Sequence, residues 1–187
     1  MVCGDTILRS LLFVPGHIDR FYSSALTSDA DALVLDLEDS VPEDKKDLAR
    51  ASVAEKLLTC DFPRSVLARV NGADTGRLEE DIEALAHGTL NAYIVPKTGN
   101  ADDVLQVDGL LKKAEIKKEL PPGSLGIFPL IETCEAVMKV MEIAQASARV
   151  QGLVFGHEDF LLNLNASHTQ DNSNLAVPRI RVAMAAR

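Results

Sequence analysis

Residues 125–133 read LGIFPLIET and residues 152–160 read GLVFGHEDF, and these two stretches are the most informative part of the chain. Each is a short apolar run that ends in an acid, Glu132 in the first and Asp159 in the second. Such runs are typical of strands buried on both faces of a parallel sheet, and ligands bind at the carboxyl ends of those strands. Two carboxylates with no thiolate or imidazole pair beside them suit Mg²⁺ better than Zn²⁺. We therefore predict a metal-assisted enzyme with a Mg²⁺ site at Glu132 and Asp159.

Further apolar runs precede these two and alternate with helical patterns. The six runs that predict strands are Leu11–Pro15, 32–37, 66–70, Ala92–Val95, 125–131 and 152–155. Apolar residues at helical spacing predict helices over 42–58, 74–87, 101–120 and 132–148. Residues 163–174 are polar and predict a loop, and residues 175–187 predict a last helix. The alternation predicts βα units with right-handed crossovers.

Six such strands could form an open doubly wound sheet or most of a (β/α)8 barrel. No GxGxxG motif follows the first run, which counts against a dinucleotide-binding fold. Polar side chains follow five of the runs, and the mouth of a barrel brings such residues together. We therefore predict an α/β fold of the (β/α)8 TIM-barrel type, with residues 1–187 as a single domain that lacks the last two strands.

The composition of the chain indicates which classes of binding partner and which cellular compartment to expect. The chain has 187 residues, of which 47% are hydrophobic, and its net charge of −9 argues against nucleic acid or an anionic membrane as a partner. Cys3, Cys60 and Cys134 form no CxxC pair, so a disulfide framework is not expected and a reduced compartment fits. No stretch reaches the roughly 20 apolar residues of a membrane span, and the first residues lack a secretory signal. We expect a cytoplasmic protein, with an organelle as the alternative.

Arg69 ends the run SVLARVNG and is a candidate for anion binding. A charge at the end of a buried strand needs a partner, and the planar guanidinium suits a substrate carboxylate. The alternative is a structural ion pair with Glu38 or Asp36 of the DLEDS segment. Of these acids, Glu38 is the better candidate for orienting Arg69. Lys97 in IVPKT could pair with an acid, bind a phosphate or carboxylate, or form a Schiff base.

The acids of the predicted metal site also have ordinary alternatives. Glu132 could be a first-turn acid favoured by a helix dipole, and Asp159 could be an N-cap or first-turn residue. His157 and Glu158 precede Asp159, but no HExxH motif is present, so the sequence does not support a zinc protease.

Six segments together resemble one known family. They are LRSLLFVPG, DALVLDLEDSVPEDKKDLAR, LARVNG, YIVPKT, FPLIET and GLVFGHEDF. In this order they resemble the citrate lyase β-subunit family, within the HpcH/HpaI aldolase and malyl-CoA lyase group. The resemblance covers nearly all of residues 7–187.

The resemblance implies a (β/α)8 barrel that uses Mg²⁺ to cleave or form a carbon–carbon bond in a 3-hydroxyacyl-CoA. Citryl-, malyl- and citramalyl-CoA are typical substrates of the family, and acetyl-CoA and a 2-oxo acid are the products. It implies that Glu132 and Asp159 are the metal ligands, that Arg69 holds the oxo-acid carboxylate and that Glu38 supports Arg69. Arg9 and the FVPG loop with Gly16 would approach the CoA.

The resemblance leaves the general acid or base of the reaction open. The chain ends at Arg187, where the family continues into a seventh strand, and relatives take part of their acid–base machinery from beyond this point or from a neighbouring subunit. A homo-oligomer, a trimer or hexamer, is expected. The alternatives are a class II-type aldolase acting on free 2-oxo acids and a non-catalytic or regulatory subunit that retains the fold.

Overall fold

The computed structural model describes residues 2–3 and 6–187. Its centre is a parallel sheet of six strands, paired in the order in which they follow along the chain. They are β3 (Leu11–Pro15), β4 (Ala32–Asp36), β5 (Ser65–Arg69), β6 (Ala92–Val95), β7 (Gly126–Ile131) and β8 (Val154–Phe155). A short antiparallel ribbon, β1 (Val2–Cys3) and β2 (Thr6–Ile7), precedes the sheet. All six predicted strands are confirmed.

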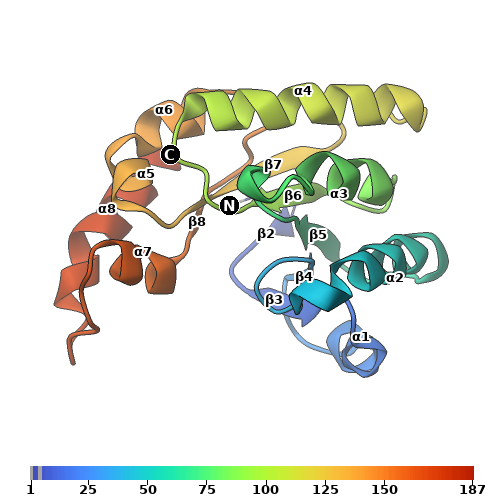
Figure 1. Cartoon of the computed structure of the whole chain (residues 1–187), viewed down its shortest axis with the longest axis horizontal. Coiled ribbons are helices and arrows are strands. Elements are labelled where there is room, and N and C mark those ends of the chain that lie inside the picture. Colours follow the sequence, from blue (N-terminus) through green and yellow to red (C-terminus); the bar gives the residue numbers. More distant parts are fainter. Residues whose placement is uncertain (1, 4–5) are drawn as a thin grey trace.

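The strand order distinguishes a barrel-type winding from a doubly wound sheet. In a doubly wound sheet the order reverses at a switch point, whereas here each strand pairs with the next one along the chain. Right-handed crossovers then place the helices on one face, and Figure 1 shows α2, α3 and α4 along the outer side of the curled sheet. The architecture is therefore a curled six-strand half-barrel. Within the described residues no further strand follows β8.

Helices connect the strands at the predicted places, with three differences. The helices are α1 (Asp19–Leu26), α2 (Lys46–Thr59), α3 (Leu78–Leu85), α4 (Ala101–Lys117), α5 (Cys134–Met138), α6 (Val140–Gln145), α7 (His157–Asn163) and α8 (Ala176–Ala185), and 3-10 turns cover Glu43–Lys45, Ala73–Thr75 and Ser173–Leu175. The helix predicted over 132–148 is two helices, α5 and α6, separated at Lys139. Helices α1 and α7 were not predicted.

Alternate side chains of the strands build two apolar layers, as the period of two in a strand requires. One set packs under the helices and includes Leu33, Leu35, Val66, Ala68, Tyr93, Ile127 and Ile131. The other set fills the concave side and comprises Leu8, Ala32, Val34, Leu67, Ala92, Ile94, Phe128 and Leu130. Leu11 of β3 and Val154 of β8 both pack on this inner set. The two edge strands therefore curl around one shared core.

The C-terminal helices present an apolar surface. Large hydrophobic side chains are exposed on α5 to α8 and the loop after α7, namely Met138, Met141, Leu162, Leu164, Val177, Ile180 and Met184. A cavity of about 530 Å³ lies between α6, the segment before β8 and the end of α8.

Among the helices of the described residues, none combines the length and the apolar composition that a membrane span requires.

A buried ion-pair network fastens α4 to the segment before β8. Arg149 donates to both carboxylate oxygens of Glu115 at 2.6 and 2.7 Å and to Asp108 at 2.7 Å. It also donates to the carbonyl oxygen of Leu125, just before β7. Because Leu125 precedes its strand, this network lies at the amino ends of the strands.

Candidate active site

The carboxyl edge of the sheet gathers charged side chains from five successive strands. Asp36 ends β4, and Arg69 ends β5. Lys97 and Glu132 follow β6 and β7, and Asp159 lies in the first turn of α7 after β8. Because all the strands are parallel, these residues share one edge of the half-barrel.

Arg69 is held mainly by Asp36, its direct partner in the strand register. The guanidinium donates to both oxygens of Asp36, at 2.7 and 2.6 Å, and its Nη1 lies 2.9 Å from Glu38 Oε2 and 3.4 Å from Asp39 Oδ2. It also lies over the ring of Phe13, 5.1 Å from the centroid. Although burial opposes the charge on Asp36, these bonds keep the pKa of Asp36 below its usual value. The ion pair considered in the sequence is therefore present, with Asp36 as the principal partner.

Glu38 is buried beside this pair. Burial raises the pKa of Glu38 to about 7, even though the Arg69 charge opposes the shift. The backbone N–H of Asp39 donates to Glu38 Oε2 at 3.0 Å. Lys46 of α2, which the sequence did not single out, donates from Nζ to the carbonyl oxygens of Leu37 and Glu38 at 2.9 and 2.8 Å. Lys46 thus fixes the loop that carries Glu38.

Glu132 is the least compensated buried acid of the edge, because Asp36 and Glu38 both pair with Arg69. Its residue is 4% exposed, and burial raises its pKa to about 7. The backbone N–H of Lys97 donates to Glu132 Oε1 at 2.5 Å and opposes this shift, whereas the nearby charge of Asp159 adds to it. A buried carboxylate next to a second carboxylate is stabilised in its charged form by a bound cation. The pair fits a divalent metal ion with oxygen ligands.

Lys97 contributes to this site through its backbone. Its φ of 53° is in the left-handed region, which a residue with a Cβ adopts at a cost of about 1–3 kcal/mol. This conformation accompanies the N–H bond to Glu132. The side chain is 51% exposed and its Nζ lies 3.5 Å from Asp74 Oδ2. The ammonium therefore remains accessible beside the site.

Gly156 allows α7 to lie directly against Glu132. A Cβ at this position would lie 2.9 Å from both Glu132 Cβ and Glu132 Oε2. The Gly156 N–H donates to the carbonyl oxygen of Ile131 at 3.0 Å, which anchors the start of α7 to the end of β7. This close approach brings Asp159, in the first turn of α7, toward Glu132.

Gly16 lies at the same edge, whereas Arg9 lies at the opposite one. The Gly16 N–H donates to the carbonyl oxygen of Asp36 at 2.8 Å, and a Cβ there would lie 2.8 Å from that oxygen and from Val53. Arg9 precedes β3 and binds Asp31, which precedes β4, with its Nη2 at 2.8 Å from Asp31 Oδ1. The structure thus places Arg9 at the amino ends of the strands, on the side away from Arg69, which does not favour the expected approach of Arg9 to the CoA.

Asp81 is a further polar residue that sequence reasoning missed. It is fully buried in α3 and accepts bonds from the backbone N–H and the side-chain amide of Asn71, at 2.9 and 2.7 Å. It also accepts from Arg50 Nε at 2.7 Å. Asp81 thereby fixes the turn directly after Arg69. Asp81 lies on the apolar stripe of its helix, and no residue of opposite charge lies within two positions of it in the sequence. The sequence therefore gives no signal of this partner.

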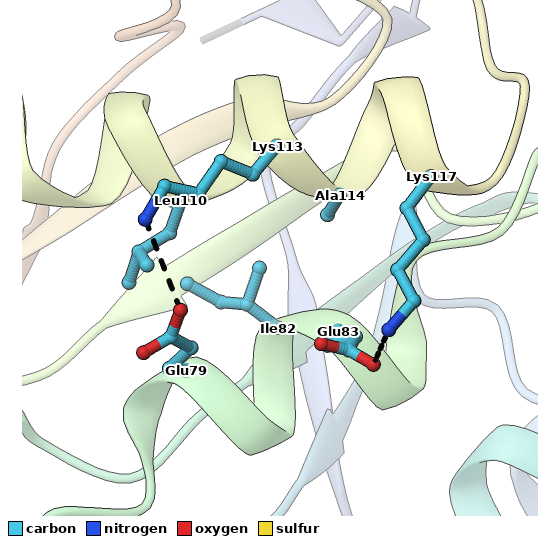
Figure 2. A pocket seen from close by; sticks show the side chains of 7 residues that line it. All are labelled: Glu79, Ile82, Glu83, Leu110, Lys113, Ala114 and Lys117. Atoms are coloured by element: carbon cyan, nitrogen blue, oxygen red, sulfur yellow. Dashed lines mark hydrogen bonds and ion pairs between the residues drawn. The ribbon is translucent and has the colours of Figure 1, made fainter.

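Two cavities near these elements differ in character. Figure 2 shows a small one, of about 80 Å³, between α3 and α4, where Lys113 faces Glu79 and Lys117 faces Glu83 over Ile82, Leu110 and Ala114. Paired charges over an apolar floor make it a gap between packed helices. A cleft of about 300 Å³ instead borders the site edge and is lined by Lys97, Thr98 and Asp74 among others. Its volume reaches the lower range of small-molecule sites.

Comparison with known proteins gives one consistent result. The family described as HpcH/HpaI aldolase/citrate lyase matches residues 9–187. Citrate lyase subunit beta of Escherichia coli (strain K12) is 36% identical over 182 residues, which cover 96% of this chain and 60% of that protein. L-malyl-CoA/beta-methylmalyl-CoA lyase of Cereibacter sphaeroides is 36% identical over 166 residues, or 86% of this chain and 52% of that protein. The chain thus spans about 60% or less of the length of these relatives.

A solved structure has a similar fold. The citrate lyase beta subunit from M. tuberculosis, complexed with oxaloacetate and magnesium, superposes with a TM-score of 0.73 at 27% identity. The match covers 94% of this chain and 72% of that one.

Proposed function

Because the chain belongs to the HpcH/HpaI aldolase/citrate lyase family, we propose that it forms the metal site of a Mg²⁺-dependent carbon–carbon lyase. The reaction is cleavage or formation of a 3-hydroxyacyl-CoA such as citryl-, malyl- or citramalyl-CoA, with acetyl-CoA and a 2-oxo acid as the other side. The observation that carries the proposal is the position of Glu132, a buried carboxylate at the carboxyl edge of the sheet that is close enough to Asp159 for the two charges to repel.

Glu132 and Asp159 would hold the Mg²⁺ ion. Their carboxylates are hard oxygen ligands, and the charge of Asp159 disfavours the charged form of Glu132 until a cation binds. When bound, the ion supplies a Lewis acid for the oxygen atoms of a 2-oxo acid. The Lys97 amide holds Glu132 in place through Oε1, and Gly156 lies against Oε2.

Arg69 would hold the carboxylate of the 2-oxo acid. Its Nε and Nη2 are bound to Asp36, so the group is fixed in orientation. Its Nη1 faces Glu38 and the exposed Asp39, and Asp39 at 3.4 Å is the partner that an incoming carboxylate can replace. Glu38 then supports Arg69 from the buried side. Orientation of a substrate by fixed groups lowers the entropic part of the barrier.

Lys97 and the Gly16 loop would bind the remaining anionic parts of the CoA ester. The Lys97 ammonium is half exposed at the mouth, and the Gly16 loop lies against the end of β4.

We further propose that the chain is a single domain of a (β/α)8 barrel. The protein would assemble as a homo-oligomer, a trimer or hexamer. The cysteine spacing is consistent with a cytoplasmic protein.

The test combines Mg²⁺ titration by calorimetry with turnover of the three CoA esters. Glu132→Gln and Asp159→Asn should each abolish Mg²⁺ binding and turnover, because each removes one of two charged ligands. Glu135→Gln is the matched control, since Glu135 is an exposed acid three residues from Glu132 and is paired with Lys139. Unchanged Mg²⁺ affinity in Glu132→Gln would overturn the assignment.

Two outcomes of the same experiment identify the alternatives. Condensation of free 2-oxo acids without CoA esters would indicate a class II-type aldolase. Binding of Mg²⁺ and oxaloacetate without any turnover would indicate a non-catalytic or regulatory subunit.

A further inference from the structure

A second group of metal-ligand side chains lies on α7 and the loop that follows it. His157 and Glu158 are in the first turn of α7, and His168 reaches back to them from ten residues further along the chain. His168 Nε2 lies 3.0 and 3.1 Å from the two oxygens of Glu158, and His157 Nε2 lies 3.1 Å from Glu158 Oε1. The two imidazole rings meet edge to face, with centroids 5.5 Å apart.

The spacing of the three ligand atoms suits one small cation. The atoms that each residue can offer all lie within 4.8 Å of one another. In a tetrahedral zinc site with bonds of about 2.0–2.1 Å, neighbouring ligand atoms are separated by about 3.3 Å. Small rotations of these exposed side chains therefore suffice to surround an ion.

The donor set differs from that of Glu132 and Asp159. Imidazole nitrogen suits Zn²⁺, Cu²⁺ and Ni²⁺, whereas carboxylates alone suit Mg²⁺. Two His and one Glu with an open fourth position is a known donor set for zinc. All three side chains are accessible, so an ion can reach them without opening the fold.

We propose that His157, Glu158 and His168 form a transition-metal site that binds Zn²⁺. This site is separate from the proposed Mg²⁺ site at Glu132 and Asp159. A bound ion would fasten the segment 164–175 to the first turn of α7. Asp159 belongs to that same turn, so the ion would restrict the helix that carries a proposed Mg²⁺ ligand. The inference stands on the geometry of the three residues and does not depend on the proposed lyase activity.

Calorimetric titration of the full chain with Zn²⁺ in excess Mg²⁺ tests this site. His168→Ala, His157→Ala and Glu158→Gln should each weaken Zn²⁺ binding by at least about tenfold, because loss of a group that merely orients a metal ligand already costs about 10–100-fold. His87→Ala is the matched control, since it removes an imidazole that is bonded to Thr89 elsewhere in the fold. Asp159→Asn should lose Mg²⁺ and keep Zn²⁺, which separates the two sites.

Two further measurements report on the ligands and on the loop. The imidazole resonances of His157 and His168, and not those of His87, should shift when Zn²⁺ is added. Amide hydrogen exchange should slow within residues 164–175. Absence of Zn²⁺ binding, or binding that His168→Ala leaves unchanged, would overturn the site, and shifts confined to cysteine neighbours would do the same.

Discussion

Replacement of Glu132 by glutamine should stabilise the metal-free protein above neutral pH while removing a ligand of the proposed Mg²⁺ site. The carboxyl group is buried, and this burial is the main reason why its pKa is raised from 4.5 to about 7. The Lys97 N–H bond lowers the pKa, whereas repulsion from Asp159 raises it further. The native state thus holds this proton more tightly than the unfolded chain does. The contribution to stability is fully present below about pH 4.5 and is lost as the pH rises through about 7.

The size of the effect follows from the shift. A pKa displaced from 4.5 to about 7 corresponds to about 3 kcal/mol of lost stability once the group is fully ionised. Glutamine resembles the protonated acid in shape, stays neutral and keeps an oxygen that can accept the Lys97 N–H bond. Glu132→Gln should therefore be more stable than the wild type by up to about 3 kcal/mol near pH 8.5 and equal to it near pH 4.

Urea unfolding followed by circular dichroism, in EDTA and across this pH range, measures the difference. Glu135→Gln is again the control, because the Lys139 bond lowers the pKa of the exposed Glu135 and its removal should stabilise the protein at no pH. Excess Mg²⁺ should reverse the order, since a ligand stabilises only the native state that binds it. A Glu132→Gln protein that is less stable than the wild type near pH 8.5 in EDTA would refute the reasoning.

Three further predictions concern packing and the two ends of the sheet. Gly156→Ala places a methyl group 2.9 Å from Glu132, so it should cost about 1–3 kcal/mol and weaken Mg²⁺ binding in calorimetry. The control is Gly109→Ala in α4, whose methyl group meets no atom within 4 Å and should increase the free energy of unfolding by about 0.5–1 kcal/mol. Equal Mg²⁺ affinity in Gly156→Ala and Gly109→Ala would contradict the packing argument. Arg149→Met leaves the buried Glu115 without its ion-pair partner and Asp108 with the exposed Lys112, so it should cost about 3–5 kcal/mol in urea unfolding with unchanged Mg²⁺ affinity. Weaker Mg²⁺ binding in the folded variant would count against the separation of this network from the proposed Mg²⁺ site. Arg9→Ala should leave the KM for CoA esters unchanged, and a raised KM would return Arg9 to the site.

The strands and the site edge could be predicted because their signals are local. A parallel strand buried on both faces is a short continuous apolar run, and all six runs form strands. Once the strands are parallel, a polar residue at the end of a run must lie at the carboxyl edge, which is where Arg69 and Glu132 are found. The same logic, applied to Arg9 before the first run, indicates the amino edge, so the strand direction and the motif resemblance give different expectations for Arg9.

The remaining features depend on contacts that local patterns do not contain. The break at Lys139 separates two short helices within one continuous helical pattern. The left-handed backbone of Lys97 occurs together with a bond to Glu132, 35 residues away. His168 likewise meets Glu158 only after the loop folds back on α7.

The two sides of the site edge are compensated to different extents, and this difference bears on how a ligand would bind. Arg69 already has a bidentate partner in Asp36, so its charge is largely satisfied without a ligand. Within the described residues Glu132 has a single N–H donor and a neighbouring negative charge, so its ionised form gains much from a bound cation. Binding of a cation at Glu132 and Asp159 would also raise the local positive potential. A 2-oxo acid would then be attracted to the cation first and oriented by Nη1 of Arg69 second. Removal of Mg²⁺ should therefore weaken oxo-acid binding more than replacement of Arg69 does.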